Sequence, residues 1–219
     1  MSSYHSIDNI PVVTKNLLYV NVIMFLATLI SPAFMKDTFA MAVPLSTEFR
    51  CWQPLTHMFM HDGFLHIFFN MYTLLMFGMV VERALGTKKF IWFYLITGFG
   101  AVLLHTGVEF FEVHQLIAKY PGISAQSIYN SIPGVLGASG AVYGVLVAFA
   151  MLYPEARLTL IFPPITLDAK WWVLIFIGIE LFTGITGTQM GVAHFAHLGG
   201  ALFGWLLIRY WRKSGKLYR

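Results

Sequence analysis

The sequence PGVLGASGAVYGVLVAFAMLY, residues 133–153, decides the fold of this chain. It is uncharged and mostly apolar, and a helix needs about 20 such residues to cross a bilayer. We therefore expect a membrane-spanning helix with Ser139 near its head, between Gly137 and Gly140. A serine in such a helix usually packs against a neighbouring helix or bonds to it. Taken alone, Ser139 indicates packing rather than chemistry.

The composition of the whole chain agrees with a membrane protein. Of its 219 residues, 58% are hydrophobic and only 11% are charged, whereas soluble domains carry about 25% charged residues. The net charge of +4 is small, and we expect no nucleic-acid partner. The single cysteine, Cys51, excludes a disulfide within the chain. The expected fold class is all-α, a polytopic membrane protein.

Apolar stretches of about 17–25 residues, the length that a bilayer requires, occur six times along the chain. Segments 35–61, 112–132 and 154–170 separate them; the first is typical of an interfacial segment, the second of a polar loop and the third of a connector. Residues 1–16 are polar, and no cleavable signal peptide is evident. The six expected spans are Leu17–Phe34, Phe64–Val81, Phe90–Phe110, Pro133–Tyr153, Trp171–Thr188 and Val192–Trp211.

The basic residues are distributed unequally between the two sides of such a bundle. With six spans both termini lie on one side, which would hold eleven of the 14 lysines and arginines, leaving Lys36, Arg50 and Lys119 on the other. Cytoplasmic segments carry the excess of basic residues, so we expect both termini in the cytoplasm. Ser139 then enters from the outer face, roughly 9 Å below Pro133 at the rise of an α-helix.

A histidine stands at a matching depth in another span. His197, within the run AHLGG at 196–200, lies near the start of the sixth stretch and enters from the same outer face. A serine becomes a nucleophile when a neighbouring histidine accepts its proton. The pair Ser139 and His197 therefore predicts a nucleophile with its general base.

Both of these spans carry small residues at intervals of four positions. Such stripes let two helix backbones approach closely in lipid, and packing one stripe on the other would bring Ser139 to His197. Most stripes of this kind only pack helices, whereas here the packing would also set the distance between nucleophile and base. The small residues are Gly140, Gly144 and Ala148 in the fourth span and Gly200 and Gly204 in the sixth.

A third polar motif, HIFFN at residues 66–70, lies on the second span. Its histidine and asparagine, His66 and Asn70, share one helix face, and polar side chains in a membrane usually face the bundle interior. One interpretation is a hydrogen-bonded pair between helices. The other is an oxyanion hole, which supplies donors for the charge that forms when Ser139 attacks a carbonyl group. The Ser139 N–H, near a helix N-terminus, adds a third donor.

These motifs, in this order on three spans, resemble those of the rhomboid intramembrane serine proteases over about Arg50–Gly204. The resemblance implies a six-transmembrane-helix rhomboid-like bundle with a Ser–His dyad in a water-filled cavity open to the outer face. It makes Ser139 the nucleophile and His197 the base. By position it makes His66, Asn70 and the Ser139 amide the donors of the oxyanion hole, and Tyr143 the ring on which the catalytic histidine stacks. It also makes Gly137 part of the serine motif, and Gly200 and Gly204 the residues of a helix contact.

The resemblance also implies an activity. We expect a serine-type endopeptidase, with no metal or cofactor, that cleaves transmembrane segments of membrane proteins near the outer face, after a small side chain. Its expected partners are these substrates and the lipid bilayer, and its expected location is the bacterial inner membrane. The expected domains are a short cytoplasmic segment 1–16, a transmembrane catalytic domain 17–211 and a basic cytoplasmic tail 212–219.

The alternative is a rhomboid-like pseudoprotease, which binds membrane segments without cleaving them. Inactive relatives lack the serine or the histidine, and this chain has both Ser139 and His197, which favours the enzyme.

Two residues, Gln53 and His194, depart from the family pattern, and Glu180 is an acid within a span. Gln53 stands where many members have arginine, and His194 where many have asparagine or aspartate. His194 is open to three roles: a partner for water or tyrosine, an interfacial residue, or a proton acceptor. Glu180, in mid-span, either bonds within the bundle or lies on a proton or ion path. The sequence places no acidic residue to orient His197, so we expect a dyad and not a triad.

Overall fold

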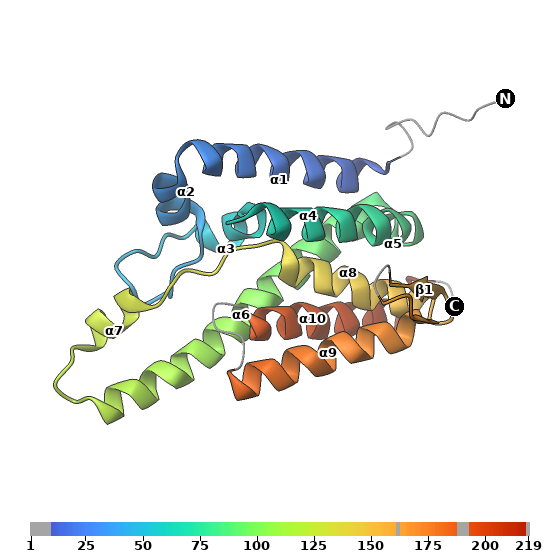
Figure 1. Ribbon diagram of the computed structural model, residues 1–219. Helices are drawn as coiled ribbons and strands as arrows, with labels where there is room; N and C mark the ends of the chain where they lie inside the picture. Colours follow the sequence, from blue (N-terminus) through green and yellow to red (C-terminus); the bar gives the residue numbers. More distant parts are fainter. Residues whose placement is uncertain (1–9, 161–162, 188–192, 218–219) are drawn as a thin grey trace.

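The structure is a computed structural model that describes residues 10–160, 163–187 and 193–217. Long helices run back and forth between two ends of the molecule (Figure 1). In chain order the helices are α1 Val12–Ile30, α2 Pro32–Phe39, α3 Gln53–Thr56, α4 Phe64–Thr73, α5 Met79–Leu85, α6 Thr87–Lys119, α7 Ala125–Ser131, α8 Ser139–Leu152, α9 Ala169–Thr186 and α10 His194–Lys213. A 3₁₀ turn at His57–Phe59 follows α3, a π-helical turn at Leu74–Gly78 joins α4 to α5, and the strands are β1 Arg157–Thr159 and β2 Thr166–Asp168.

The two ends differ in what they carry. One end, which we call the hairpin end, holds the antiparallel hairpin β1–β2 and the end of α10 (Figure 1). The other, the α7 end, holds α2, α3 and α7, and both α8 and α10 begin on its side (Figure 1). The side chains at the start of α8 and α10 are therefore directed to the same region of the bundle.

Among the residues that the structure describes, four helical segments are long and apolar enough to cross a membrane: α1, the continuous helix Phe64–Leu85, α6 and α9. The other two passes lie at the centre of the bundle. α8 is apolar but has only 14 residues, about 21 Å against a hydrocarbon core of about 30 Å. α10 begins with two histidines and ends with basic residues. The chain is a polytopic helical membrane protein.

The first span was predicted a few residues too late in the chain, and the second was predicted too short. α1 begins at Val12 rather than Leu17 and ends at Ile30, so Phe34 belongs to α2 instead. The second helix passes Val81 and ends at Leu85, because the next residue is a glycine with φ of +79°. Its polar last turn stays helical because Glu82 is buried against the start of α1.

The third span and the loop after it were predicted wrongly in extent. α6 has 33 residues, Thr87–Lys119, instead of the expected Phe90–Phe110. Residues 112–119 therefore continue α6, and α7 occupies a second part of the expected loop. The extension is held by a small apolar cluster at the α7 end, which contains Val43, Val113, Ile128 and Tyr129.

The fourth helix starts later than predicted. Residues 133–138 are not helical, since Val135 and Met41 exchange two backbone hydrogen bonds of 2.8 Å. The N–H of Gly137 donates to the His57 carbonyl at 2.9 Å, and the φ of Gly137 is +133°, a conformation that glycine tolerates. Ser139 is thus the first residue of α8 rather than a residue one to two turns inside it.

The remaining predictions concern the last third of the chain. The connector 154–170 contains the β1–β2 hairpin, with Arg157 opposite Asp168. α9 begins at Ala169, two residues before the expected Trp171, and α10 ends at Lys213, two after Trp211. The expected bounds Thr188 and Val192 lie outside the described residues.

Glycines bring α6, α8 and α10 into backbone contact. A Cβ atom added to Gly200 would lie 1.8 Å from the carbonyl oxygen of Gly140, and one added to Gly204 would lie 2.9 Å from Cα of Gly144. On the other side of α10, a Cβ at Gly199 would lie 2.6 Å from the carbonyl oxygen of Gly100. No side chain fits between these helices, so the glycine seam fixes the distance between the starts of α8 and α10.

Candidate active site

Ser139 and His197 meet at the start of the glycine seam. Ser139 Oγ lies 2.7 Å from His197 Nε2, the distance of a hydrogen bond. Ser139 is the first residue of α8, and His197 lies in the first turn of α10. The first N–H groups of a helix have no carbonyl partner within it, so the backbone around Ser139 also presents donors and the positive end of the helix dipole.

Tyr143 lies one turn after Ser139 and fixes the plane of the imidazole. Its ring stacks on that of His197 with 4.5 Å between ring centroids and 7° between the planes. The stack limits rotation of the imidazole, so its two nitrogens keep distinct surroundings. Nε2 faces the serine, and Nδ1 faces α9.

An acidic side chain does lie beside His197, and the expectation of none is wrong. The Oε1 atom of Glu180, on α9, is 2.9 Å from His197 Nδ1, an ion-pair distance. The two atoms are close enough for a hydrogen bond, but the angle of the contact at Nδ1 is unsuitable for one. The register of α9 against α10 cannot be read from the sequence, which therefore did not show which face of α9 would reach the histidine.

Glu180 also contacts a second histidine, His194, and so connects it to the site. Its Oε2 atom lies 2.6 Å from His194 Nδ1, and its Oε1 atom accepts a hydrogen bond of 2.5 Å from the Tyr143 hydroxyl. His194 Nδ1 is also 3.1 Å from Thr183 Oγ1. His194 is only 6% exposed, which rules out the interfacial role among the three left open by the sequence.

The two residues of the second-span motif differ in their placement. A Cβ atom built on Gly137 would lie 2.9 Å from His66 Nε2 and 3.5 Å from Ser139 Oγ, so His66 reaches the serine region. On its other side, His66 Nδ1 is 3.6 Å from a carboxylate oxygen of Asp62. Asn70 is buried, and its Nδ2 donates to the His66 carbonyl at 3.0 Å, a contact within its own helix.

The segment before α4 holds residues 133–138, which we call the Gly137 loop, in place. Gln53 is buried, and its Oε1 accepts the N–H groups of Arg50 at 3.0 Å and Ala42 at 3.3 Å. His57 Nδ1 lies 3.0 Å from the Gln53 carbonyl oxygen, and the His57 carbonyl receives the N–H of Gly137. Burial lowers the pKa of His57 to about 4, so this histidine is neutral at neutral pH.

A large cavity of about 1050 Å³ opens onto Ser139 and His197. It lies at the α7 end and is bordered by segments 36–53 and 130–136 and by α6, with polar side chains that suit a water-filled space. Its ionisable side chains, apart from His197, are Lys36, Asp37, Glu48, Asp62, His66, His105, Glu109 and Glu112. Within the described ranges, no group of three or more His, Cys, Asp or Glu side chains is arranged to hold a metal ion.

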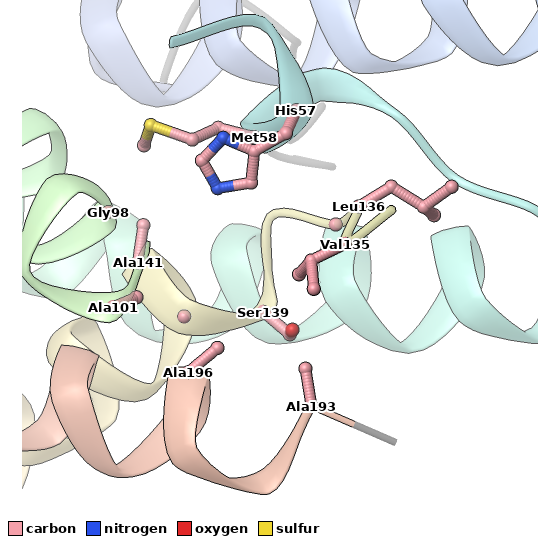
Figure 2. A pocket seen from close by; sticks show the side chains of 12 residues that line it. His57, Met58, Gly98, Ala101, Val135, Leu136, Ser139, Ala141, Ala193 and Ala196 are labelled. Atoms are coloured by element: carbon pink, nitrogen blue, oxygen red, sulfur yellow. The ribbon is translucent and has the colours of Figure 1, made fainter. Parts of the chain in front are cut away.

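A second, very small cavity of about 10 Å³ lies directly beside Ser139, roughly the space of one water molecule. Figure 2 shows side chains around it from the 3₁₀ turn, α6, the Gly137 loop, the start of α8 and the start of α10. The sequence motifs did not indicate this cavity, because most of the residues in its walls are small or apolar. They include Met58, Gly98, Ala101, Val135, Ala193 and Ala196.

Comparison with known proteins gives a family for this arrangement. The family described as Rhomboid domain matches residues 48–214. The match includes α3 to α10 and therefore Ser139, His197 and the side chains that contact them.

Similar curated proteins come from a bacterium and from mitochondria. Rhomboid protease AarA of Providencia stuartii is 31% identical over 158 residues, 71% of this chain and 54% of that protein. Presenilin-associated rhomboid-like protein, mitochondrial, of Homo sapiens is 33% identical over 166 residues, 75% of this chain and 39% of that protein. Presenilin-associated rhomboid-like protein A, mitochondrial, of Danio rerio is 27% identical over 180 residues, 80% of this chain and 42% of that protein. This chain spans about half or less of the length of these relatives.

Proposed function

This chain belongs to the rhomboid family, and from that premise we propose that it is an intramembrane serine endopeptidase with Ser139 as nucleophile and His197 as general base. The observation that carries the proposal is the 2.7 Å contact between Ser139 Oγ and His197 Nε2 beside a large cavity that several ionisable side chains line. A serine that only packs helices has no need of a base or of access to water. The relative from Providencia stuartii, named as a rhomboid protease, supports the same activity.

The chemistry follows from the two atoms in contact. His197 Nε2 accepts the Ser139 hydroxyl proton while Oγ bonds to the substrate carbonyl carbon, which gives a tetrahedral oxyanion. The peptide C–N bond then breaks, and the proton passes from Nε2 to the leaving amine. A water molecule from the cavity, deprotonated by the same nitrogen, releases the acyl group and restores the serine.

The oxyanion needs donors where its charge develops. The N–H of Ser139 at the start of α8 is one, and His66 Nε2, which lies against Gly137, is the second. We propose Asn70 as a third donor, although its Nδ2 donates one hydrogen to the His66 carbonyl at 3.0 Å. Its contribution depends on the other amide hydrogen and is smaller than that of His66.

The substrate is proposed to be a transmembrane segment that unwinds into the cavity. A helical peptide bond is satisfied internally, so the segment must leave the helix before Ser139 reaches its carbonyl. The cavity of about 10 Å³ beside Ser139 favours a small side chain, such as alanine, next to the cleaved bond. The unequal distribution of basic residues favours cytoplasmic termini and a cavity open to the outer face, in a bacterial inner membrane.

Cleavage of a single-span substrate by purified protein tests the proposal. We expect the wild-type protein to cut the substrate near one end of its apolar segment, and Ser139→Ala to leave it intact. Ser124→Ala is the matched control, since Ser124 is an exposed residue at the start of α7 that bonds only within that turn. Binding of the substrate without cleavage by the wild-type protein would instead indicate a pseudoprotease.

A further inference from the structure

The carboxylate of Glu180 makes more polar contacts than a helix-packing residue requires. Glu180 is 8% exposed and lies on α9, a helix apolar enough to cross a membrane. A carboxylate at that position is costly unless partners surround it. Its partners come from two other helices, and each has a hydrogen to offer: Tyr143 from α8, and His194 and His197 from α10.

The hydroxyl group of Thr183 indicates which ring nitrogen of His194 carries a hydrogen. Thr183 Oγ1 donates to the Ile179 carbonyl at 2.7 Å, so its free lone pair faces His194 Nδ1 at 3.1 Å. His194 Nδ1 must therefore carry the hydrogen, which it shares between Thr183 and Glu180 Oε2. The carboxylate is thus an acceptor towards both Tyr143 and His194, and both contacts hold its oxygens in place.

We propose that Glu180 is the positioning residue of His197, so that the site works as a triad held by His194 and Tyr143; this rests on the proposed function. A carboxylate 2.9 Å from Nδ1 keeps the hydrogen of the neutral imidazole on that nitrogen. The lone pair of Nε2 then faces Ser139 Oγ at 2.7 Å, as a general base requires. When Nε2 takes the serine proton, the positive imidazolium forms beside a fixed negative charge.

The direction of the Nδ1 contact is compatible with this role. Hydrogen bonds of catalytic groups are often poorly aligned without substrate and become better aligned during reaction. The Tyr143 ring restrains the imidazole plane, and the Tyr143 hydroxyl restrains the carboxylate. One side chain therefore holds both partners of the contact.

Kinetics of Glu180→Gln test the proposal. The amide has the shape of the carboxylate but no charge, and its NH₂ group favours the wrong tautomer of His197. We expect kcat to fall on the order of 10²-fold, as for a misplaced catalytic group, with KM nearly unchanged. The rate at which a fluorophosphonate probe labels Ser139 should fall in parallel, because that reaction needs the same base. Glu180→Asp keeps the charge and should recover part of both rates.

A matched control separates positioning from stability. Glu82→Gln neutralises another buried carboxylate, whose hydrogen bonds within the described ranges are to the first turn of α1. It should lower the thermal unfolding midpoint and leave kcat per folded molecule unchanged. Should Glu180→Gln fail to fold, Tyr143→Phe keeps the stacked ring and removes one contact of the carboxylate, so kcat should fall several-fold.

The outcomes distinguish this inference from the proposed function. An unlabelled wild-type protein would refute the proposed function itself. If the wild-type protein is labelled and the folded variants Glu180→Gln and Tyr143→Phe react at its rate, only the role of Glu180 is refuted. A lower kcat with unchanged KM in Glu180→Gln, absent from Glu82→Gln, supports it.

Discussion

Two carboxylates are buried in the part of the chain that the structure describes, Glu82 at the end of α5 and Glu180 in α9, and they face different groups. Glu82 is 2% exposed and accepts the N–H groups of Val13 and Thr14 at 3.0 and 2.7 Å, and the Thr14 hydroxyl at 2.7 Å. α1 begins after Pro11 and has no side-chain cap of its own, so Glu82 caps it from another helix. Glu180 has as many contacts, but they are with two histidines and a tyrosine.

Burial of an acid therefore does not by itself indicate a catalytic site. Backbone N–H groups at a helix N-terminus are fixed donors, and a carboxylate there stabilises the helix. Imidazoles change protonation during reactions near neutral pH, and a carboxylate beside them influences that change. The proposed division is therefore that Glu82 contributes to stability and Glu180 to reaction rate.

The first prediction concerns the glycine seam, which brings the serine to the histidine beside Glu180. Gly200→Ala places a Cβ atom 1.8 Å from the Gly140 carbonyl oxygen, so α8 and α10 must separate. A shift of about 1 Å at the Ser139–His197 contact costs around 10²-fold in rate, with the Glu82 contacts left intact. Cleavage per folded molecule measures it.

Two further variants serve as comparisons for this loss of activity. Gly204→Ala should be milder, because its Cβ atom would lie 2.9 Å from the Gly144 backbone, and Leu202→Ala, at an exposed position of α10, should cleave normally. Full activity in Gly200→Ala would mean that the seam does not set the distance of the catalytic pair.

The second prediction concerns Glu82 alone. Glu82→Ala leaves two buried N–H groups of α1 without their acceptor, which should destabilise the fold by about 1–3 kcal/mol for each unsatisfied group that water does not reach. Activity per folded molecule should stay at the wild-type level. Thermal unfolding in detergent, read beside the cleavage rate, measures both. A slower rate at unchanged stability would remove the contrast with Glu180.

The third prediction is a pH dependence of stability from the α7 end. Burial lowers the pKa of His57 to about 4 and that of His61 to about 3. Below pH 6.5 the unfolded chain binds a proton at each position and the folded chain does not. The free energy of unfolding should therefore decrease as the pH falls, by an amount approaching about 1.4 kcal/mol per pH unit for each histidine.

The unfolding midpoint between pH 7.5 and 5 checks this dependence. A folded His57→Gln variant should show a shallower slope, since one of the two histidines is gone. An equal slope in that variant and the wild-type protein would show that other groups cause the dependence.

The sequence was sufficient for the number of passes and for bringing Ser139 near His197. Spaced glycines and polar residues in apolar helices are local signals, and each has a direct physical meaning in lipid. Helix bounds were predicted less well: α6 continues past Glu112 because apolar packing at the α7 end supports it, and α8 begins at Ser139 because Val135 pairs with Met41.

Glu180 shows where a single sequence stops being informative. An acid in mid-span and two histidines three residues apart at the start of α10 were both visible. Their meeting depends on how α9 is rotated against α8 and α10, and the apolar residues of α9 are spread over all its faces. That rotation is a property of the packed bundle, so the contact with His197 appears only in the structure.

The most direct test of the central claim is to find which residue reacts with a fluorophosphonate probe. The purified, folded protein is labelled in detergent, digested and analysed by mass spectrometry, beside Ser139→Ala and Ser124→Ala. We predict a single adduct on Ser139 in the wild-type and Ser124→Ala proteins and none in Ser139→Ala. Equal labelling of all three proteins, or no labelling of a wild-type protein that cleaves its substrate, would contradict Ser139 as the nucleophile.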